Sequence, residues 1–113
     1  DAQASFRAGE IVEITAAQAG RTIADGVRTL RVGAITFAHI RRYVDDIVTV
    51  GEAEIESATR KLLLGAKLVV EPTAALPFAA YLYHQGELPA SRNTVMILSG
   101  GNIDPAMLRS LLA

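Results

Sequence analysis

Cysteine and tryptophan are both absent from this 113-residue sequence. Without cysteine the chain can form neither a disulfide nor a thiolate metal site, which is typical of a protein from a reducing compartment, so a cytoplasmic location is expected. The sequence also lacks an uninterrupted apolar run of the roughly 18 residues or more that a membrane-spanning helix needs. We therefore expect no transmembrane segment.

A large excess of charge is missing as well, since eleven lysines and arginines stand against twelve aspartates and glutamates. A nearly neutral chain has no broad field that would attract nucleic acid or an anionic membrane, and neither is expected as a partner. The first residues, Asp1-Ala2-Gln3-Ala4-Ser5, contain no initiator methionine and no signal-peptide pattern. This beginning is typical of a chain that starts part-way along a longer protein.

Apolar residues make up 50% of the sequence, which is enough for one hydrophobic core, so residues 1–113 are expected to form a single unit. An Ala-rich stretch opens the chain and predicts a short helix. Thr36 is a plausible N-cap for a second helix with Phe37, Ile40 and Val44 at helical spacing. Further helices are predicted after Gly51, from about residue 74 to 83, and after the capping pair Asp104-Pro105.

Four short apolar runs predict β-strands between these helices. They cover residues 11–14, 47–50, 67–70 and 95–98, and the second is rich in stiff β-branched side chains. Alternation of strands with helices predicts an α/β fold with an open, mainly parallel sheet flanked by helices.

The turn after the last predicted strand could contact a ligand. Ligands of open α/β sheets bind beyond the carboxyl ends of strands, and Ser99 is placed there, followed by two glycines that allow close approach to the backbone. By itself, this pattern is more typical of an ordinary turn from a strand to a helix than of a ligand site.

Four motifs in order resemble the threonine dehydratase and serine racemase family of pyridoxal-phosphate enzymes. They are Thr22-Ile23-Ala24-Asp25-Gly26, Val44-Asp45-Asp46-Ile47, Val70-Glu71-Pro72-Thr73 and Ser99-Gly100-Gly101-Asn102-Ile103-Asp104. The resemblance covers nearly the whole chain. It implies the fold type II architecture, like that of the tryptophan synthase β subunit, and makes this chain the C-terminal portion of the large cofactor-binding domain, with the N-terminal portion and the small domain absent.

The resemblance also implies roles for individual residues. Ser99 matches the hydroxyl residue that faces the pyridine nitrogen, and a hydroxyl is too weak an acid to protonate the ring, which suits β-elimination. Gly100 and Asn102 belong to the same cofactor-binding turn, and Glu71 matches a glutamate near the ring. Glu71 could equally be a carboxylate held by backbone N–H groups at a helix start.

Two further sites are implied on the substrate side and at the amino terminus. Gly26 matches a cofactor-binding position and Asp25 a substrate-side position, although Asp-Gly is also a common turn dipeptide. Asp1 resembles the end of a segment that binds a hard cation such as Mg²⁺ or Ca²⁺. The isolated histidines, His39 and His84, are expected to have solvated or capping roles.

The lysine that holds the family's cofactor covalently, and the Gly-rich loop that binds its phosphate, have no counterpart here. We therefore expect the isolated chain to be inactive. The complete protein is expected to be a lyase that converts L-threonine or L-serine to a 2-oxo acid and ammonia. Serine racemization, or a non-catalytic module for oligomerisation or ligand sensing, remains open, and association with a second copy or with missing segments is expected.

Overall fold

Helices and extended loops make up the whole computed structural model, which describes residues 1–113. The helices are α1 (Ala2–Ala8), α2 (Ala16–Ala19), η1 (Asp25–Val27), α3 (Ala34–Tyr43), α4 (Glu52–Leu64), α5 (Pro72–Tyr83), η2 (Gln85–Glu87) and α6 (Pro105–Leu112). None of these helices is long and apolar enough to cross a membrane.

Helix α4 confirms the helix predicted after Gly51. Glu52 and Glu54 lie in its first turn and Lys61 in its last, so their charges oppose the helix dipole. Its apolar face is buried through Ile55 and Leu62, among others. Packing of this face, more than helix propensity, holds the helix in place.

Helix α5 begins at Pro72, which needs no hydrogen-bond partner for its nitrogen at the first helical position. Pro77 lies inside the helix and removes the N–H that would reach back to the Thr73 carbonyl. The buried face of α5 is mostly alanine, so α4 can approach closely. Residues of the central core cluster are Ala58, Leu62, Val70, Ala74, Ala75 and Ala79.

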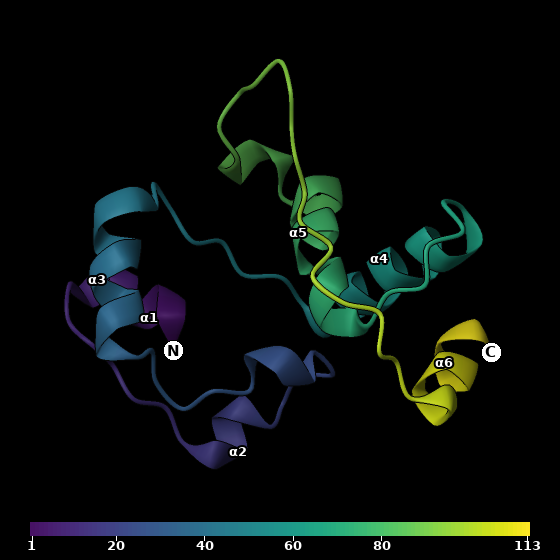
Figure 1. The fold of residues 1–113 in the computed structure, drawn as a ribbon, viewed down its shortest axis with the longest axis horizontal. Coiled ribbons are helices and arrows are strands. Elements are labelled where there is room, and N and C mark those ends of the chain that lie inside the picture. The colour runs from purple at the N-terminus through teal and green to yellow at the C-terminus, as the bar shows by residue number, and fades with distance from the viewer.

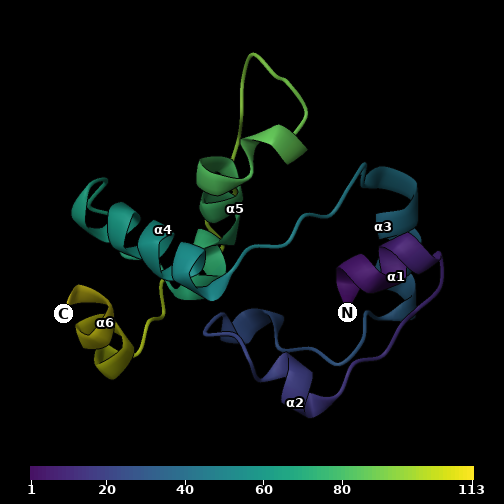
Figure 2. The same cartoon turned by 180° about the vertical axis from the view of Figure 1, so that it is seen from behind.

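The molecule is flat, with principal extents of 41 × 38 × 21 Å, and its longer helices form two groups, with the short α2 apart from both (Figures 1 and 2). In one group α4 packs on α5, and α6 is attached through the Nε of Arg60, which donates to the Leu111 carbonyl at 2.6 Å. In the other, α1 packs on α3, and the Nε2 of Gln3 donates to the Ile47 carbonyl at 2.7 Å. Extended chain joins the two groups.

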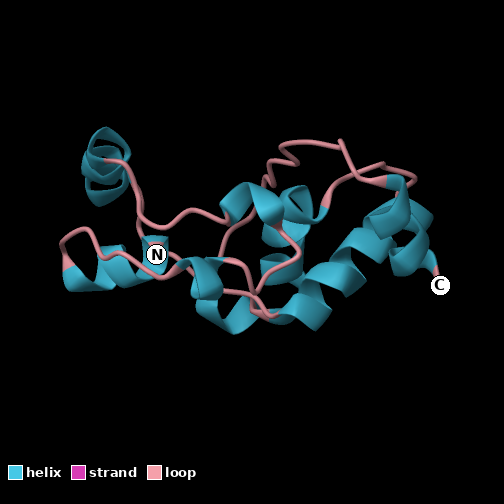
Figure 3. Ribbon diagram, turned by 90° about the horizontal axis from the view of Figure 1, so that it is seen from below, coloured by secondary structure: helices cyan, strands magenta, loops and turns pink.

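The four predicted strands are wrong as elements of this structure, which contains no strand (Figure 3). Residues 11–14, 47–50 and 95–98 are extended loops without a regular hydrogen-bond ladder. A strand exists only where a neighbour accepts and donates in register, and these runs lack such a neighbour. Apolar side chains are consequently exposed, including Val95 at 88% and Ile97 at 77%.

Two element boundaries also differ from prediction. Helix α3 begins at Ala34 with Gly33 as its N-cap, so Thr36 is not the cap. The run 67–70 does not begin as a strand, because Lys67 has a φ of 60° and its Nζ donates to the Leu64 carbonyl at 2.7 Å. Lys67 therefore lies in a left-handed turn just after α4, whose C-cap is Gly65.

Candidate cofactor and substrate site

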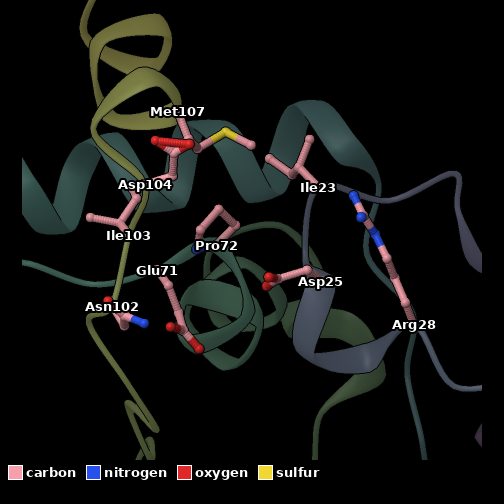
Figure 4. Close-up of a pocket in the computed structure, with 9 residues that line it drawn as sticks. All are labelled: Ile23, Asp25, Arg28, Glu71, Pro72, Asn102, Ile103, Asp104 and Met107. Carbon is pink, nitrogen blue, oxygen red and sulfur yellow. The ribbon is translucent and has the colours of Figure 1, made fainter.

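A small cavity of about 140 Å³ lies where the loop around η1, the start of α5 and the segment before α6 meet (Figure 4). Its lining residues are Ile23, Asp25, Arg28, Glu71, Pro72, Asn102, Ile103, Asp104 and Met107. Asp25, Glu71 and Asn102, predicted from three separate motifs, therefore share one cavity. The cavity is smaller than the roughly 300–1,000 Å³ typical of ligand pockets, so these residues form a wall rather than an enclosed site.

The glycine turn lies directly against Glu71. The Glu71 N–H donates to the Gly100 carbonyl at 3.2 Å. A Cβ on Gly100 would lie 3.1–3.3 Å from the Glu71 carboxyl group, and one on Gly101 only 2.5 Å from the Val69 carbonyl oxygen. The two glycines therefore let two segments far apart in the sequence run side by side.

Thr73 links the loop containing Asp25 to helix α5. The Gly26 N–H donates to Thr73 Oγ1 at 3.0 Å, and Thr73 Oγ1 lies 3.4 Å from Asp25 Oδ1 as a long hydrogen-bond donor. A Cβ on Gly26 would come within 2.8 Å of the Thr73 methyl carbon. Sequence reasoning quoted Thr73 in its motif but missed this contact.

Two further hydrogen bonds hold the same loop. The Ile23 N–H donates to Glu52 Oε2 at 2.7 Å, which attaches the loop to the start of α4. Arg28 donates from Nε and Nη2 to the Thr22 carbonyl at 2.9 and 2.6 Å. Sequence reasoning missed Arg28, whose only signal was its place two residues after the Asp-Gly pair.

Ser99, Gly100 and Gly26 do not line the cavity, and Ser99 is exposed. Asp1 lines a different cavity, where its Oδ2 accepts from Thr29 Oγ1 at 2.9 Å. The chain contains no group of three or more His, Asp or Glu side chains arranged to hold a metal ion. The cation site at Asp1 thus stays a prediction.

His84 joins α4 to the end of α5, away from the cavity. Its Nδ1 lies 2.6 Å from Glu87 Oε1 and its Nε2 lies 2.9 Å from Glu54 Oε2. The hydrogen bonds to Glu87 and Glu54 raise the pKa of His84 above 6.5. The Gly51 N–H and then His84 lower the pKa of Glu54 below 4.5. His84 therefore has a structural rather than a purely solvated role.

Comparison with models of known protein families decides the family. Residues 1–100 match the model of the family described as pyridoxal-phosphate dependent enzyme. The chain belongs to this family. It is 44% identical over 113 residues to the L-threo-3-hydroxyaspartate ammonia-lyase of Saccharomyces cerevisiae, covering 100% of this chain and 33% of that protein.

Further similarities support the same family assignment. The chain is 42% identical over 104 residues to the serine racemase of Schizosaccharomyces pombe, covering 92% of this chain and 31% of the relative. The solved threonine deaminase of T.th. is 48% identical with a TM-score of 0.84, covering 92% of this chain and 34% of that one. The chain thus spans about a third of the length of the relatives that it matches.

The residues around the cavity fit one face of pyridoxal phosphate but not all of it. A carboxylate and an amide of the lining could contact the polar atoms of a flat ring. Lysine is absent from the lining, and the only lysines of the chain are Lys61 and Lys67. Lys67 is engaged with a helix carbonyl. No lining residue of this cavity is therefore a lysine that could hold the cofactor covalently.

Proposed function

We propose that this chain is the C-terminal portion of a pyridoxal-phosphate-dependent ammonia-lyase that acts on 3-hydroxy amino acids. The observation that carries the proposal is the meeting of Asp25, Glu71 and Asn102 around one cavity, in a chain that belongs to the cofactor's family. The reaction would convert the substrate to a 2-oxo acid and ammonia. Bound pyridoxal phosphate would supply the electron sink for this β-elimination.

The individual residues have the following proposed roles. Ser99 contacts the pyridine nitrogen without protonating it, while Gly100 and Asn102 shape the turn against the cofactor. Glu71 lies at the ring edge, and Gly26 and Asp25 form the substrate side. Asp1 contributes one oxygen ligand to a Mg²⁺ or Ca²⁺ site whose other ligands come from elsewhere in the protein.

We also propose that the extended runs become strands of a parallel sheet in the complete protein. The agreement of this chain with a solved relative at a TM-score of 0.84 supports the proposal, because the backbone follows that path even without strand partners. Residues 1–113 would then form one part of the large domain. A cytoplasmic, oligomeric enzyme fits the cysteine-free sequence and the exposed apolar runs.

The direct test is an assay of the complete protein with added pyridoxal phosphate. L-threonine, L-serine and L-threo-3-hydroxyaspartate are supplied separately, and release of 2-oxo acid and ammonia is measured. Release from at least one of them is expected. Conversion of L-serine to D-serine without release would instead make the protein a racemase, as similarity to a serine racemase allows.

A non-catalytic module is the alternative of a different class. The absence of lysine from the cavity lining is the observation that favours it. Complete protein that binds no pyridoxal phosphate and converts none of the three amino acids would support this alternative and contradict the lyase.

A further inference from the structure

Asp25 and Gly26 form the only Asp-Gly pair of the chain, and Asp25 projects from the start of η1 toward the cavity (Figure 4). Both residues are exposed, so water reaches them. A peptide bond between aspartate and glycine is especially open to rearrangement, because glycine has no Cβ to shield its nitrogen from the aspartate side chain. The pair is therefore a chemically reactive point beside the proposed substrate contact.

The rearrangement needs no reagent other than water. The Gly26 nitrogen forms a bond to Cγ of Asp25, and its proton leaves with the hydroxyl of the carboxyl group as water. The resulting five-membered succinimide then takes up water at one of its two carbonyl groups. Cleavage at the side-chain carbonyl restores aspartate, whereas cleavage at the main-chain carbonyl gives isoaspartate, in which the backbone runs through the former side chain.

The turn of η1 holds this peptide in a conformation that cannot close the ring. Asp25 is the first residue of this 3₁₀ helix, and its carbonyl accepts from the Arg28 N–H at 3.1 Å. Ring closure requires the peptide to rotate until the Gly26 nitrogen lies in one plane with Cβ of Asp25, well away from the helical ψ. That rotation breaks the turn.

Thr73 restrains the same peptide from outside the loop. Its Oγ1 accepts from the Gly26 N–H at 3.0 Å and lies 3.4 Å from Asp25 Oδ1, to which it donates. The backbone hydrogen bonds of residues 22–28 stay within that segment, and Thr73 and Glu52 are the two side chains outside it that are hydrogen-bonded to it. The Thr73 hydroxyl is thus the attachment that acts on the reacting nitrogen itself.

We propose that the bond between Asp25 and Gly26 is a site of spontaneous isoaspartate formation and that Thr73 suppresses this reaction. Glycine is required here for packing, because a Cβ would come within 2.8 Å of the Thr73 methyl carbon. The close fit that demands glycine therefore creates the reactive pair, and the same threonine restrains it. The rate of modification is set by how often this local contact opens.

The test measures isoaspartate in the complete protein during incubation at neutral pH. Trypsin cuts after Arg21 and Arg28, and chromatography with electron-transfer fragmentation separates the aspartyl and isoaspartyl forms of peptide 22–28. We expect Thr73→Val to form isoaspartate roughly 2- to 10-fold faster than wild type, which is the range for loss of one hydrogen bond. Thr73→Ser keeps the hydroxyl and should react at the wild-type rate. Equal or slower formation in Thr73→Val would overturn the proposal.

Two references keep the result independent of how well that variant folds. Peptide 43–60 of the same digest contains Asp45 and Asp46, each followed by a residue with a side chain, and it should gain no isoaspartate. The synthetic peptide 22–28 reacts without restraint, and wild-type protein should react at least about 10-fold more slowly, because both η1 and the Thr73 contact must open. Equal rates in protein and synthetic peptide would overturn the proposal, as would equal isoaspartate in peptides 43–60 and 22–28.

Isoaspartate should also impair substrate binding, and this consequence rests on the proposed function. The backbone gains one carbon and the side chain loses one, so the carboxylate withdraws from the cavity. We expect kcat/KM of the whole preparation to fall in proportion to its isoaspartate content. Isoaspartate that accumulates with unchanged kcat/KM would keep the modification site and contradict the substrate-side role of Asp25. Active enzyme that forms no isoaspartate, even as Thr73→Val, would keep the lyase and overturn this inference.

Discussion

Ser99 carries the most specific chemical role proposed for a single side chain. Its exposed hydroxyl lies at the end of an extended run, one residue before the glycine that contacts Glu71. A neutral hydroxyl there can accept or donate one hydrogen bond without changing the charge of a bound ring. Loss of the Ser99 hydroxyl should therefore lower the rate of elimination only moderately, and a variant that keeps the hydroxyl should keep the rate.

We predict that Ser99→Ala lowers elimination by the complete protein roughly 5- to 10-fold, which corresponds to one lost hydrogen bond of about 1 kcal/mol. Ser99→Thr keeps the hydroxyl and should retain most of the activity. The measurement is kcat for 2-oxo acid release from the preferred substrate. Equal turnover in Ser99→Ala and wild type would show that the contact with the pyridine nitrogen is misassigned.

The adjacent glycines should differ in their tolerance of a side chain. A Cβ on Gly101 meets the Val69 backbone carbonyl at 2.5 Å, whereas one on Gly100 meets the movable end of Glu71. Gly101→Ala should lower the free energy of unfolding of the complete protein by about 1–3 kcal/mol, and Gly100→Ala by less. Urea denaturation measures both.

A Glu71 variant tests whether Gly100→Ala acts through the Glu71 carboxylate. If Gly100→Ala acts by displacing the carboxylate, its effect on cofactor affinity should shrink in a Glu71→Ala background. Equal unfolding costs for the two glycine variants, or additive effects of Gly100→Ala and Glu71→Ala, would contradict this account.

At the scale of elements, Thr73 couples the loop of η1 to the start of α5. Thr73→Val keeps the shape of the side chain but leaves the Gly26 N–H without its acceptor, at a cost of about 1 kcal/mol. We predict faster hydrogen exchange at the Gly26 amide and weaker substrate binding, seen as a higher KM. Thr73→Ser should restore both properties, and a failure to do so would mean that packing rather than the hydroxyl holds the loop.

The contact between α4 and α5 should depend on pH through His84. Because the pKa of His84 is raised, its contribution to stability is complete below about pH 6.5 and is lost as pH rises through the raised pKa. The lowered pKa of Glu54 adds stability that is present above about pH 4.5 and is lost as pH falls through the lowered pKa. This interaction is therefore strongest between these two limits.

His84→Gln should flatten that dependence. The thermal midpoint of the complete protein is measured between about pH 4 and pH 9, where histidine and carboxylates titrate. His39→Gln is the control, because the only hydrogen bond of the His39 ring is with the Ile35 carbonyl, and it pairs with no carboxylate. A pH profile that is the same in wild type and His84→Gln would contradict the assignment.

At the scale of the whole molecule, the exposed extended runs leave the fold open. Val69, Val95 and Ile97 are 64%, 88% and 77% exposed, and their backbones lack sheet partners. We predict that the 113-residue chain by itself associates with further copies, because exposed apolar runs of extended chain tend to pair. Sedimentation measures the association.

Variants with lysine on the exposed runs test whether these runs cause the association. The double variant Val95→Lys, Ile97→Lys should reduce association of the chain, since charge on an exposed edge opposes pairing. The variant Leu112→Lys, on the exposed side of α6, is the control for added charge alone. A wild-type chain that sediments as a stable monomer would contradict the prediction.

Local patterns in the sequence were enough to place most helices. Capping at Asp104, the charge order of α4 and the proline at the start of α5 act within one or two turns, so neighbouring residues determine them. The capping box of Thr15 and Gln18 also had a readable pattern, although it was not predicted. The strands could not be predicted securely, because a strand depends on a partner that may be distant or outside the chain.

The residues of the candidate site also fall into those that the sequence predicted and those that only the structure revealed. The sequence by itself determined the family resemblance and the residues of the four motifs, since these depend on residue type and order. Only the tertiary structure brought Asp25, Glu71 and Asn102 to one cavity and added Arg28 and Thr73 beside them. The physical reason is that side chains up to 77 positions apart, from Asp25 to Asn102, become neighbours only when helix packing and close glycine contacts place their backbones together.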